Sequence, residues 1–210
     1  MTPASRSVQT TFISGTRGLL RLTLLLGTLS EIFVFCFVAS AQQPKPAEYQ
    51  VKAVYLYNFG RFIEWPAAAP TRESAPNDDT FAICVLGHDP FGHALDDTLA
   101  GEVIDKRKLI AKRISNSRDA IGCRILFVSS SETGHLSEIL PSLENTGILT
   151  VSDMSGFTAN GGMIQFVLKD NKVRFEVNLT ATKQAGLTLS SQLLKVATNI
   201  IGEPSGGGVK

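Results

Sequence analysis

The chain has 210 residues, of which 43% are hydrophobic and 19% are charged, and its formal net charge is +1 at pH 7. This composition is typical of a globular protein and excludes a disordered, fibrous or polytopic membrane protein. No basic run is longer than the one in "DKRK" at residues 105–108, which is too short for the patch of a nucleic-acid surface, so we expect no nucleic-acid partner.

The N-terminal residues predict secretion. Three arginines precede the first acidic residue, and the apolar run "LTLLLGTLSEIFVFCFVASA" follows and ends in small residues. This pattern is typical of a signal peptide, here cleaved after Ala41, and indicates that the bulk of the protein lies outside the cytoplasm. The alternative is an uncleaved inner-membrane anchor formed by residues 19–41. The predicted parts of the chain are a signal at 1–41, a leader at 42–47, one domain at 48–201 and a flexible tail at 202–210.

The first predicted element after the leader is a helix over residues 48–65. Its apolar residues recur at helical spacing, and Pro66 then ends it. We expect Val51, Val54 and Phe59 to be among the side chains that pack on a sheet, because an α/β domain needs helices to cover its sheet. An exposed loop, rich in proline, is predicted to follow at 66–79.

Strands and helices then alternate along the chain. Continuous apolar runs such as "TFAICVLG" are typical of strands that are buried on both faces. Strands joined by helices of about a dozen residues pair in parallel through right-handed crossovers. The predicted strands are 80–87, 108–114, 124–130 and 148–153, and the predicted helices are 89–101 and 134–147, the second with a kink at Pro141.

The last part of the chain has a different pattern. The segment "GMIQFVLKDNKVRFEVNL" (162–179) predicts two antiparallel strands around an Asp170-Asn171 turn. Residues 190–200 predict a closing helix with Ser190 or Ser191 as its cap. The predicted fold is therefore a three-layer α/β/α sandwich, with a mainly parallel sheet and a C-terminal antiparallel hairpin at one edge.

The sequence carries no familiar motif of catalysis or metal binding. It has no His-x-x-x-His or Cys-x-x-Cys spacing and no Gly-x-Ser-x-Gly elbow. We therefore expect no catalytic residue, no metal and no cofactor.

Ligands of open α/β sheets bind beyond the carboxyl ends of the parallel strands. Polar residues at these ends form a candidate ligand site, although loop polarity alone also explains them. An enzymatic alternative is a hydrolase or transferase that uses His88, Asp89 and Asp153. The candidate residues are His88, Asp89, Ser129, Ser130, Ser131 and Asp153.

Two cysteines, Cys84 and Cys123, remain once the signal is removed, and an even pair in an oxidising compartment favours a disulfide. The register expected of the two strands argues against this disulfide. If strands 80–87 and 124–130 are neighbours that end level, the cysteines stand about three residues out of register, which at roughly 3.3 Å per residue exceeds the Cα reach of a disulfide. A bulge or another strand order would remove the objection.

Five collinear segments resemble the YfiR family of periplasmic proteins, which share the DUF4154 domain. The resemblance implies a non-enzymatic regulator with an α/β/α fold. Such a regulator binds the periplasmic sensor region of an inner-membrane diguanylate cyclase and represses it, which lowers cyclic di-GMP and biofilm formation. The segments are "YQVKAVYLYNFGRFIEWP", "FAICVLGHDPFG", "GCRILFVSS", "ILTVSDMSGFTANGGMIQFVLKDNKVRFEVNL" and "AGLTLSSQLLKVA".

The resemblance also implies a Cys84–Cys123 bridge, a homodimer and an outer-membrane lipoprotein that releases the repressed cyclase. The family regulator's second cysteine pair has no counterpart here. Arg61 and Trp65 are the predicted partner-interface residues, because arginine and tryptophan concentrate binding energy. The alternative function is a small-molecule-binding accessory protein of a sensor kinase or of an outer-membrane receptor.

Overall fold

The structure is a computed structural model that describes residues 45–66 and 79–202. These residues belong to the compact unit that begins at Pro44. The predicted signal at 1–41, most of the loop at 66–79 and nearly all of the tail at 202–210 lie outside the described residues.

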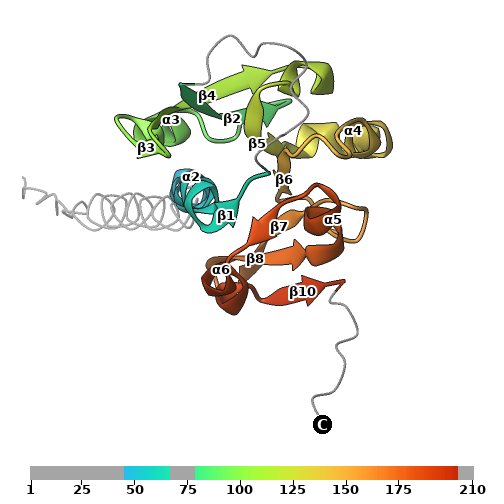
Figure 1. Ribbon diagram of the computed structural model, residues 1–210. Coiled ribbons are helices and arrows are strands. Elements are labelled where there is room, and N and C mark those ends of the chain that lie inside the picture. The colour runs from blue at the N-terminus through green and yellow to red at the C-terminus, as the bar shows by residue number, and fades with distance from the viewer. Residues whose placement is uncertain (1–44, 67–78, 203–210) are drawn as a thin grey trace, which may run out of the picture. The chain divides into compact units, whose positions relative to one another are not determined.

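An eight-stranded sheet in the order β10-β8-β7-β6-β5-β2-β4-β3 is the centre of the fold (Figure 1). Only the β7–β8 and β3–β4 pairings are antiparallel within this sheet, so the predicted mainly parallel sheet is confirmed. A separate two-stranded antiparallel sheet pairs β1 (Ile63–Glu64) with β9 (Thr188–Leu189). The strands of the large sheet are β2 (Thr80–Leu86), β3 (Val103–Ile104), β4 (Arg107–Ile114), β5 (Cys123–Val128), β6 (Leu149–Ser152), β7 (Ile164–Lys169), β8 (Lys172–Asn178) and β10 (Asn199–Ile201).

Helices cover both faces of the sheet, as the predicted sandwich requires. Alternate residues of β2 enter two different apolar clusters: Ile83 and Val85 join one, and Cys84 and Leu86 join the other. A strand buried on both faces is therefore a continuous apolar run. The first cluster takes side chains from α2 (Lys45–Phe62), α3 (His93–Leu99) and α6 (Ser191–Val196), and the second takes them from α4 (Leu136–Ser142).

The long helix α2 packs on the sheet by a different face from the one predicted. Val51 and Val54 are 44% and 43% exposed, so the prediction that they are core residues is wrong. Helical spacing alone does not fix the rotation of a helix whose apolar residues lie all around it. The buried residues of α2 are Lys52, Ala53, Leu56, Phe59 and Gly60.

The aromatic residues of α2 pack against the core: Phe59 is buried within it, and the other four are partly buried at its border, namely Tyr49, Tyr55, Tyr57 and Phe62. Tyr55 lies with its ring centroid 5.6 Å from that of Phe175 and 5.9 Å from that of Phe166. Phe59 is fully buried and contacts the same two rings. The concentration of aromatics in this segment therefore joins α2 to the β7–β8 hairpin.

The C-terminal part contains one confirmed element and one wrong boundary. Asp170 and Asn171 have φ angles of 50° and 58°, which a two-residue type I′ hairpin turn requires, and β7 pairs with β8 as predicted. The helix predicted over 190–200 ends at Val196 instead, and Asn199–Ile201 is a strand parallel to β8. This strand, β10, lies outside the hairpin, so the hairpin is not at the edge of the sheet.

Several short elements were not predicted, namely β1, β3, β9, the helix α5 (Leu179–Gln184) and the two 3₁₀ helices η1 (Ser117–Ala120) and η2 (Ser130–His135). The helix predicted over 134–147 is shorter than expected, because α4 ends at Ser142. It contains Pro141 within the helix. The short elements that were not predicted carry too few residues to show a helical or a strand period.

A disulfide joins Cys84 of β2 to Cys123 of β5, with the two Cα atoms 5.9 Å apart. The strands are neighbours, but their register shifts: Ala82 pairs with Cys123, whereas Ile83 pairs with Ile125. Arg124 is therefore the extra residue of a β-bulge. The bulge removes the geometric objection to the disulfide, because it moves Cys123 closer to the level of Cys84.

Candidate functional site

The structure places the predicted ligand residues at one end of the sheet, beyond the carboxyl ends of its parallel strands. His88 and Asp89 follow β2, Ser129 follows β5, and Asp153 follows β6. The Ser129 amide donates to the carbonyl of Leu86 at 3.0 Å, which connects the ends of β2 and β5. The carboxyl ends of these strands therefore meet as the sheet topology predicted.

Asp153 is bound by the N-terminal part of α2. Its Oδ2 accepts a hydrogen bond from Tyr49 Oη at 2.8 Å and an ion-paired one from Lys52 Nζ at 2.6 Å. Lys52 is only 3% exposed, and its Nζ also lies 2.5 Å from Glu48 Oε1. A buried ammonium needs such partners, because the loss of water costs several kcal/mol. Lys52 was not among the predicted site residues, and its i,i+4 spacing from Glu48 is the only signal of this pair in the sequence.

Tyr49 remains protonated in this cluster. Burial and then the hydrogen bond to Asp153 raise the pKa of its phenol above the ordinary value. The Lys52 ammonium also lies 4.2 Å from the centroid of the Tyr49 ring. The hydroxyl is therefore a hydrogen-bond donor that holds Asp153, and a base at this position is not expected near neutral pH.

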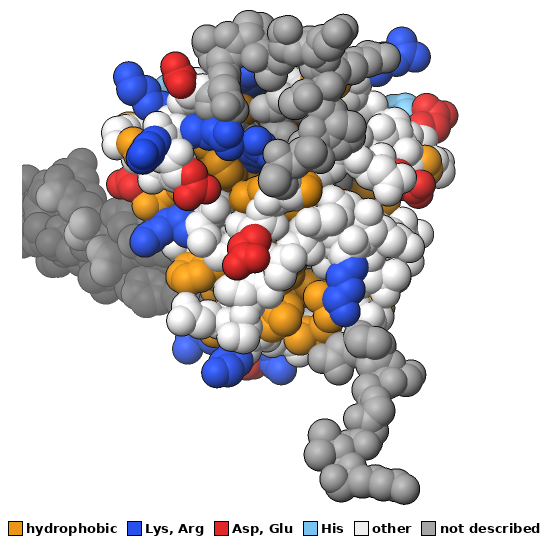
Figure 2. Space-filling view, viewed as in Figure 1, with side chains coloured by type: hydrophobic (Ala, Val, Ile, Leu, Met, Phe, Trp, Pro, Cys, Tyr) orange, Lys and Arg blue, Asp and Glu red, His pale blue; other side chains and the backbone are white. Residues whose placement is uncertain are grey.

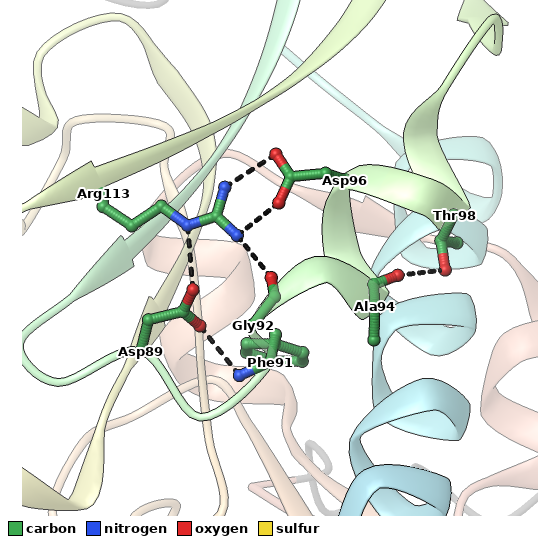
Figure 3. Close-up of polar contacts among 7 residues, drawn as sticks. All are labelled: Asp89, Phe91, Gly92, Ala94, Asp96, Thr98 and Arg113. Atoms are coloured by element: carbon green, nitrogen blue, oxygen red, sulfur yellow. Dashed lines mark hydrogen bonds and ion pairs between the residues drawn. The ribbon is translucent and has the colours of Figure 1, made fainter.

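Asp89 belongs to a second cluster, which is centred on Arg113 of β4 (Figure 3). Arg113 Nε donates to Asp89 Oδ2 at 2.9 Å, and its two terminal nitrogens donate to both carboxylate oxygens of Asp96 at 2.8 and 2.5 Å. It also donates to the Gly92 carbonyl, and Asp89 Oδ1 accepts the Phe91 amide. This bidentate geometry holds the β2–α3 loop, and no sequence motif indicated Arg113.

The electrostatics of this second cluster follow from the same contacts. Hydrogen bonds from Arg113 lower the pKa of Asp96, and the hydrogen bond to Asp96 is the main reason that the pKa of Arg113 is raised. Each group therefore favours the charged form of the other. Asp89 and Asp153 are engaged in two different clusters, each with a cation from another element.

The remaining predicted residues make local contacts. The His88 amide donates to Ser131 Oγ at 3.0 Å, and this hydroxyl donates to Glu132 Oε1 at 2.8 Å. The side chains of His88 and Ser130 lie at the surface, whereas Ser129 is buried. Gly87 has a φ of 87°, and a side chain on it would collide with Ser131 and Glu132. The close approach of these two loops therefore requires glycine.

A groove of about 560 Å³ lies at the opposite end of the sheet. The lining residues Phe81, Arg107 and Arg124 stand at the first or second position of β2, β4 and β5, which identifies this end as the amino end. Both predicted interface residues, Arg61 and Trp65, line the groove. The other lining residues are Gly60, Ile63, Glu64, Pro66, Val103, Ile104 and Asp105.

Trp65 is held by apolar contacts. Its ring packs edge-on against Phe81 with centroids 5.6 Å apart. Among the described residues, its indole Nε1 is buried and has no hydrogen-bond acceptor. A buried N–H of this kind is uncommon in native structures.

Two further observations concern metal binding and membrane-spanning helices. The part of the chain described at 45–66 and 79–202 contains no group of three or more His, Cys, Asp or Glu side chains able to hold a metal ion. No helix among these residues is long and apolar enough to cross a membrane.

Residues 49–198 match the protein family described as YfiR/HmsC-like, DUF4154. The chain belongs to this family. The matched range contains both ends of the sheet, the disulfide and the predicted site residues, and it confirms the resemblance found in the sequence. The YfiR/HmsC-like family is regulatory, and its members act as periplasmic regulators of cyclic di-GMP signalling.

Solved structures resemble this chain distantly. A conserved domain protein from Vibrio cholerae O1 biovar El Tor str. N16961 is 11% identical, with a TM-score of 0.48 over 72% of this chain and 60% of that chain. An ABC domain in complex with L-Trp from Streptococcus pneumoniae is 9% identical, with a TM-score of 0.44 over 58% of this chain and 55% of that chain. This chain thus spans less than two thirds of either protein, and no curated protein matches it.

Proposed function

We propose that this protein is a periplasmic regulator that binds the periplasmic sensor region of an inner-membrane diguanylate cyclase and represses the enzyme. Repression lowers cyclic di-GMP and therefore biofilm formation. The observation that carries the proposal is the family match, which extends over residues 49–198 and so covers nearly all of the described fold.

The geometry of the carboxyl end supports a structural role for its two aspartates rather than a catalytic one. Asp153 is held by Tyr49 and Lys52, and Asp89 is held by Arg113. A general base must reach a proton of its substrate, and its pKa is tuned towards the working pH. These acids instead fasten a helix and a loop to the ends of the strands.

The proposal is tested in cells that carry an inner-membrane diguanylate cyclase with a periplasmic region. We expect co-expression of the full chain to lower cyclic di-GMP, measured by mass spectrometry of cell extracts, and to reduce surface attachment. A cyclase that lacks its periplasmic region is the control and should be insensitive. Equal cyclic di-GMP with and without the protein would overturn the proposal, and a neighbouring sensor kinase or outer-membrane receptor gene would favour an accessory role instead.

We further propose that the regulator forms a homodimer and that an outer-membrane lipoprotein releases the cyclase from it. Light scattering of the purified protein measures the first point, with twice the mass of one chain expected. Pull-down of the regulator by the lipoprotein, with the cyclase region as competitor, measures the second.

A further inference from the structure

The groove at the amino end of the sheet combines an apolar base with a charged border. Ile63, Phe81 and Ile104 are at most 6% exposed, whereas Val103 on the border is 51% exposed. Arg61 and Glu64 are also exposed. On the face drawn in Figure 2, basic side chains likewise lie next to hydrophobic ones. The groove is therefore open to solvent along one side.

The charges of the groove differ in depth. Arg107 and Arg124 are half-buried, whereas the two acids that line the groove, Glu64 and Asp105, are exposed. Solvent and salt screen exposed charges far more than partly buried ones. Arg107 and Arg124 are therefore the charges of the groove that solvent and salt screen least.

The arginines come from three separate elements. Arg61 is in the last turn of α2, Arg107 begins β4, and Arg124 is the bulged residue of β5. A bulge re-aims a side chain, so the register shift that permits the disulfide also brings a third guanidinium to the groove. Arg107 and Arg124 have interactions within the chain as well. With five N–H donors, a guanidinium can contact an internal group and a partner carboxylate together.

The shape favours a segment of protein over a small molecule. Pockets for small ligands enclose most of the ligand surface and are mainly apolar. This groove is open and lined by charged residues, and arginine and tryptophan are the residue types that dominate protein–protein hot spots. Three guanidinium groups around an apolar base suit Asp or Glu side chains interspersed with apolar ones.

We propose that this groove is the docking site for an acidic, partly apolar segment of the protein partner. The identity of that partner as a membrane sensor rests on the proposed function. The docking chemistry rests on the groove alone, so the two can fail separately.

The main test uses purified full chain and the triple variant Arg61→Gln, Arg107→Gln, Arg124→Gln. A fluorescein-labelled peptide of alternating Glu and Leu residues is the first probe, and the periplasmic region of the cyclase is the second. We expect the triple variant to lose affinity for both probes by about tenfold or more, since charge-assisted hydrogen bonds are lost. The affinity of the unaltered chain should fall as salt rises. The matched control, Arg118→Gln with Arg174→Gln, removes exposed arginines outside the groove and should bind normally.

A second pair of variants keeps the test valid if the triple variant unfolds. Val103 is 51% exposed, so both Val103→Glu and Val103→Lys should fold. The Glu variant should weaken binding of the acidic peptide, and the Lys variant should retain or strengthen it.

Each outcome decides between the proposals. Peptide binding that depends on the arginines, without binding of the cyclase region, would overturn the proposed function and leave the groove proposal intact. Binding of the cyclase region that is unchanged in all these variants would overturn the groove proposal alone. Displacement of the peptide by free glutamate or succinate at about the same concentration would overturn the assignment to a protein segment and indicate a site for small acids.

Discussion

At the carboxyl ends of the parallel strands, Asp89 and Asp153 are each held by a cation from another element, Arg113 or Lys52. At the amino ends, arginines from three elements surround an open groove. The first arrangement uses its charges to close the fold, whereas the second places its charges along the lining of a groove, where Arg61 is exposed and Arg107 and Arg124 are half-buried. The general rule for α/β sheets points to the carboxyl end. In this protein the N-terminal turn of α2 and the β2–α3 loop already occupy that end.

The largest effect is expected where a charge of the carboxyl end is buried. We expect Lys52→Met to lower the free energy of unfolding by about 3–5 kcal/mol, because removal of one partner leaves the carboxylates of Glu48 and Asp153 uncompensated. Urea denaturation followed by circular dichroism measures this change. Lys195→Met, at an exposed position of α6, is the matched control and should change it by less than about 0.5 kcal/mol. A loss below about 1 kcal/mol in Lys52→Met would contradict the view that this end depends on its ion pairs.

The disulfide tests whether the two ends are independent. Closing a 39-residue separation should stabilise the fold by about 2–4 kcal/mol, so the Cys84→Ser, Cys123→Ser double variant should lose that amount. Because Arg124 follows Cys123, we also expect weaker binding at the groove and unchanged contacts around Asp153. Mass spectrometry after alkylation without reduction checks the bridge itself. Two freely alkylated thiols in secreted protein would rule it out.

The sequence predicted most of the fold because long apolar runs and helical periods are local signals. The strand β2 and the β7–β8 hairpin are examples: both faces of the first are buried, and the turn of the second needs two residues with positive φ. What it did not predict depends on tertiary contacts. The strand β10 has three residues and exists through its pairing with β8, and the bulge at Arg124 cannot be seen in a strand pattern.

The candidate site likewise combines features that local sequence signals predict with features that depend on tertiary contacts. Polar residues after each strand were predicted from the connectivity alone. Lys52 lies 101 residues from Asp153 in the sequence, and Arg113 lies 24 residues from Asp89. No local spacing therefore reveals these partners. Arg61 and Trp65 were predicted from residue type, and the groove that contains them requires the packing of α2 against the ends of β2, β4 and β5.

A smaller effect is expected for the exposed ion pair of the carboxyl end. The lowered pKa of Asp96 means that its carboxylate stabilises the fold above its unfolded pKa, about 3.9, and that this contribution disappears as pH falls through the folded pKa. Because Asp96 is 49% and Arg113 33% exposed, screening limits the effect. We expect Asp96→Asn to cost about 0.5–1 kcal/mol at neutral pH and progressively less as the pH falls below about 4. Asp97→Asn is the control, and a difference that persists in acid would contradict the ion-pair explanation.

The smallest change is expected for the indole N–H at the amino end. Trp65 Nε1 is buried with no acceptor among the described residues, so Trp65→Phe removes a polar group without breaking a hydrogen bond. The gain from removing an unsatisfied donor opposes the packing lost against Phe81. We therefore expect the free energy of unfolding in urea to change by less than about 1 kcal/mol. Phe62→Leu, a neighbouring aromatic replacement without a polar atom, is the comparison and should show the packing loss alone. A cost above about 2 kcal/mol, beyond that of Phe62→Leu, would mean that the N–H is satisfied in solution and that the amino end is as internally bonded as the carboxyl end.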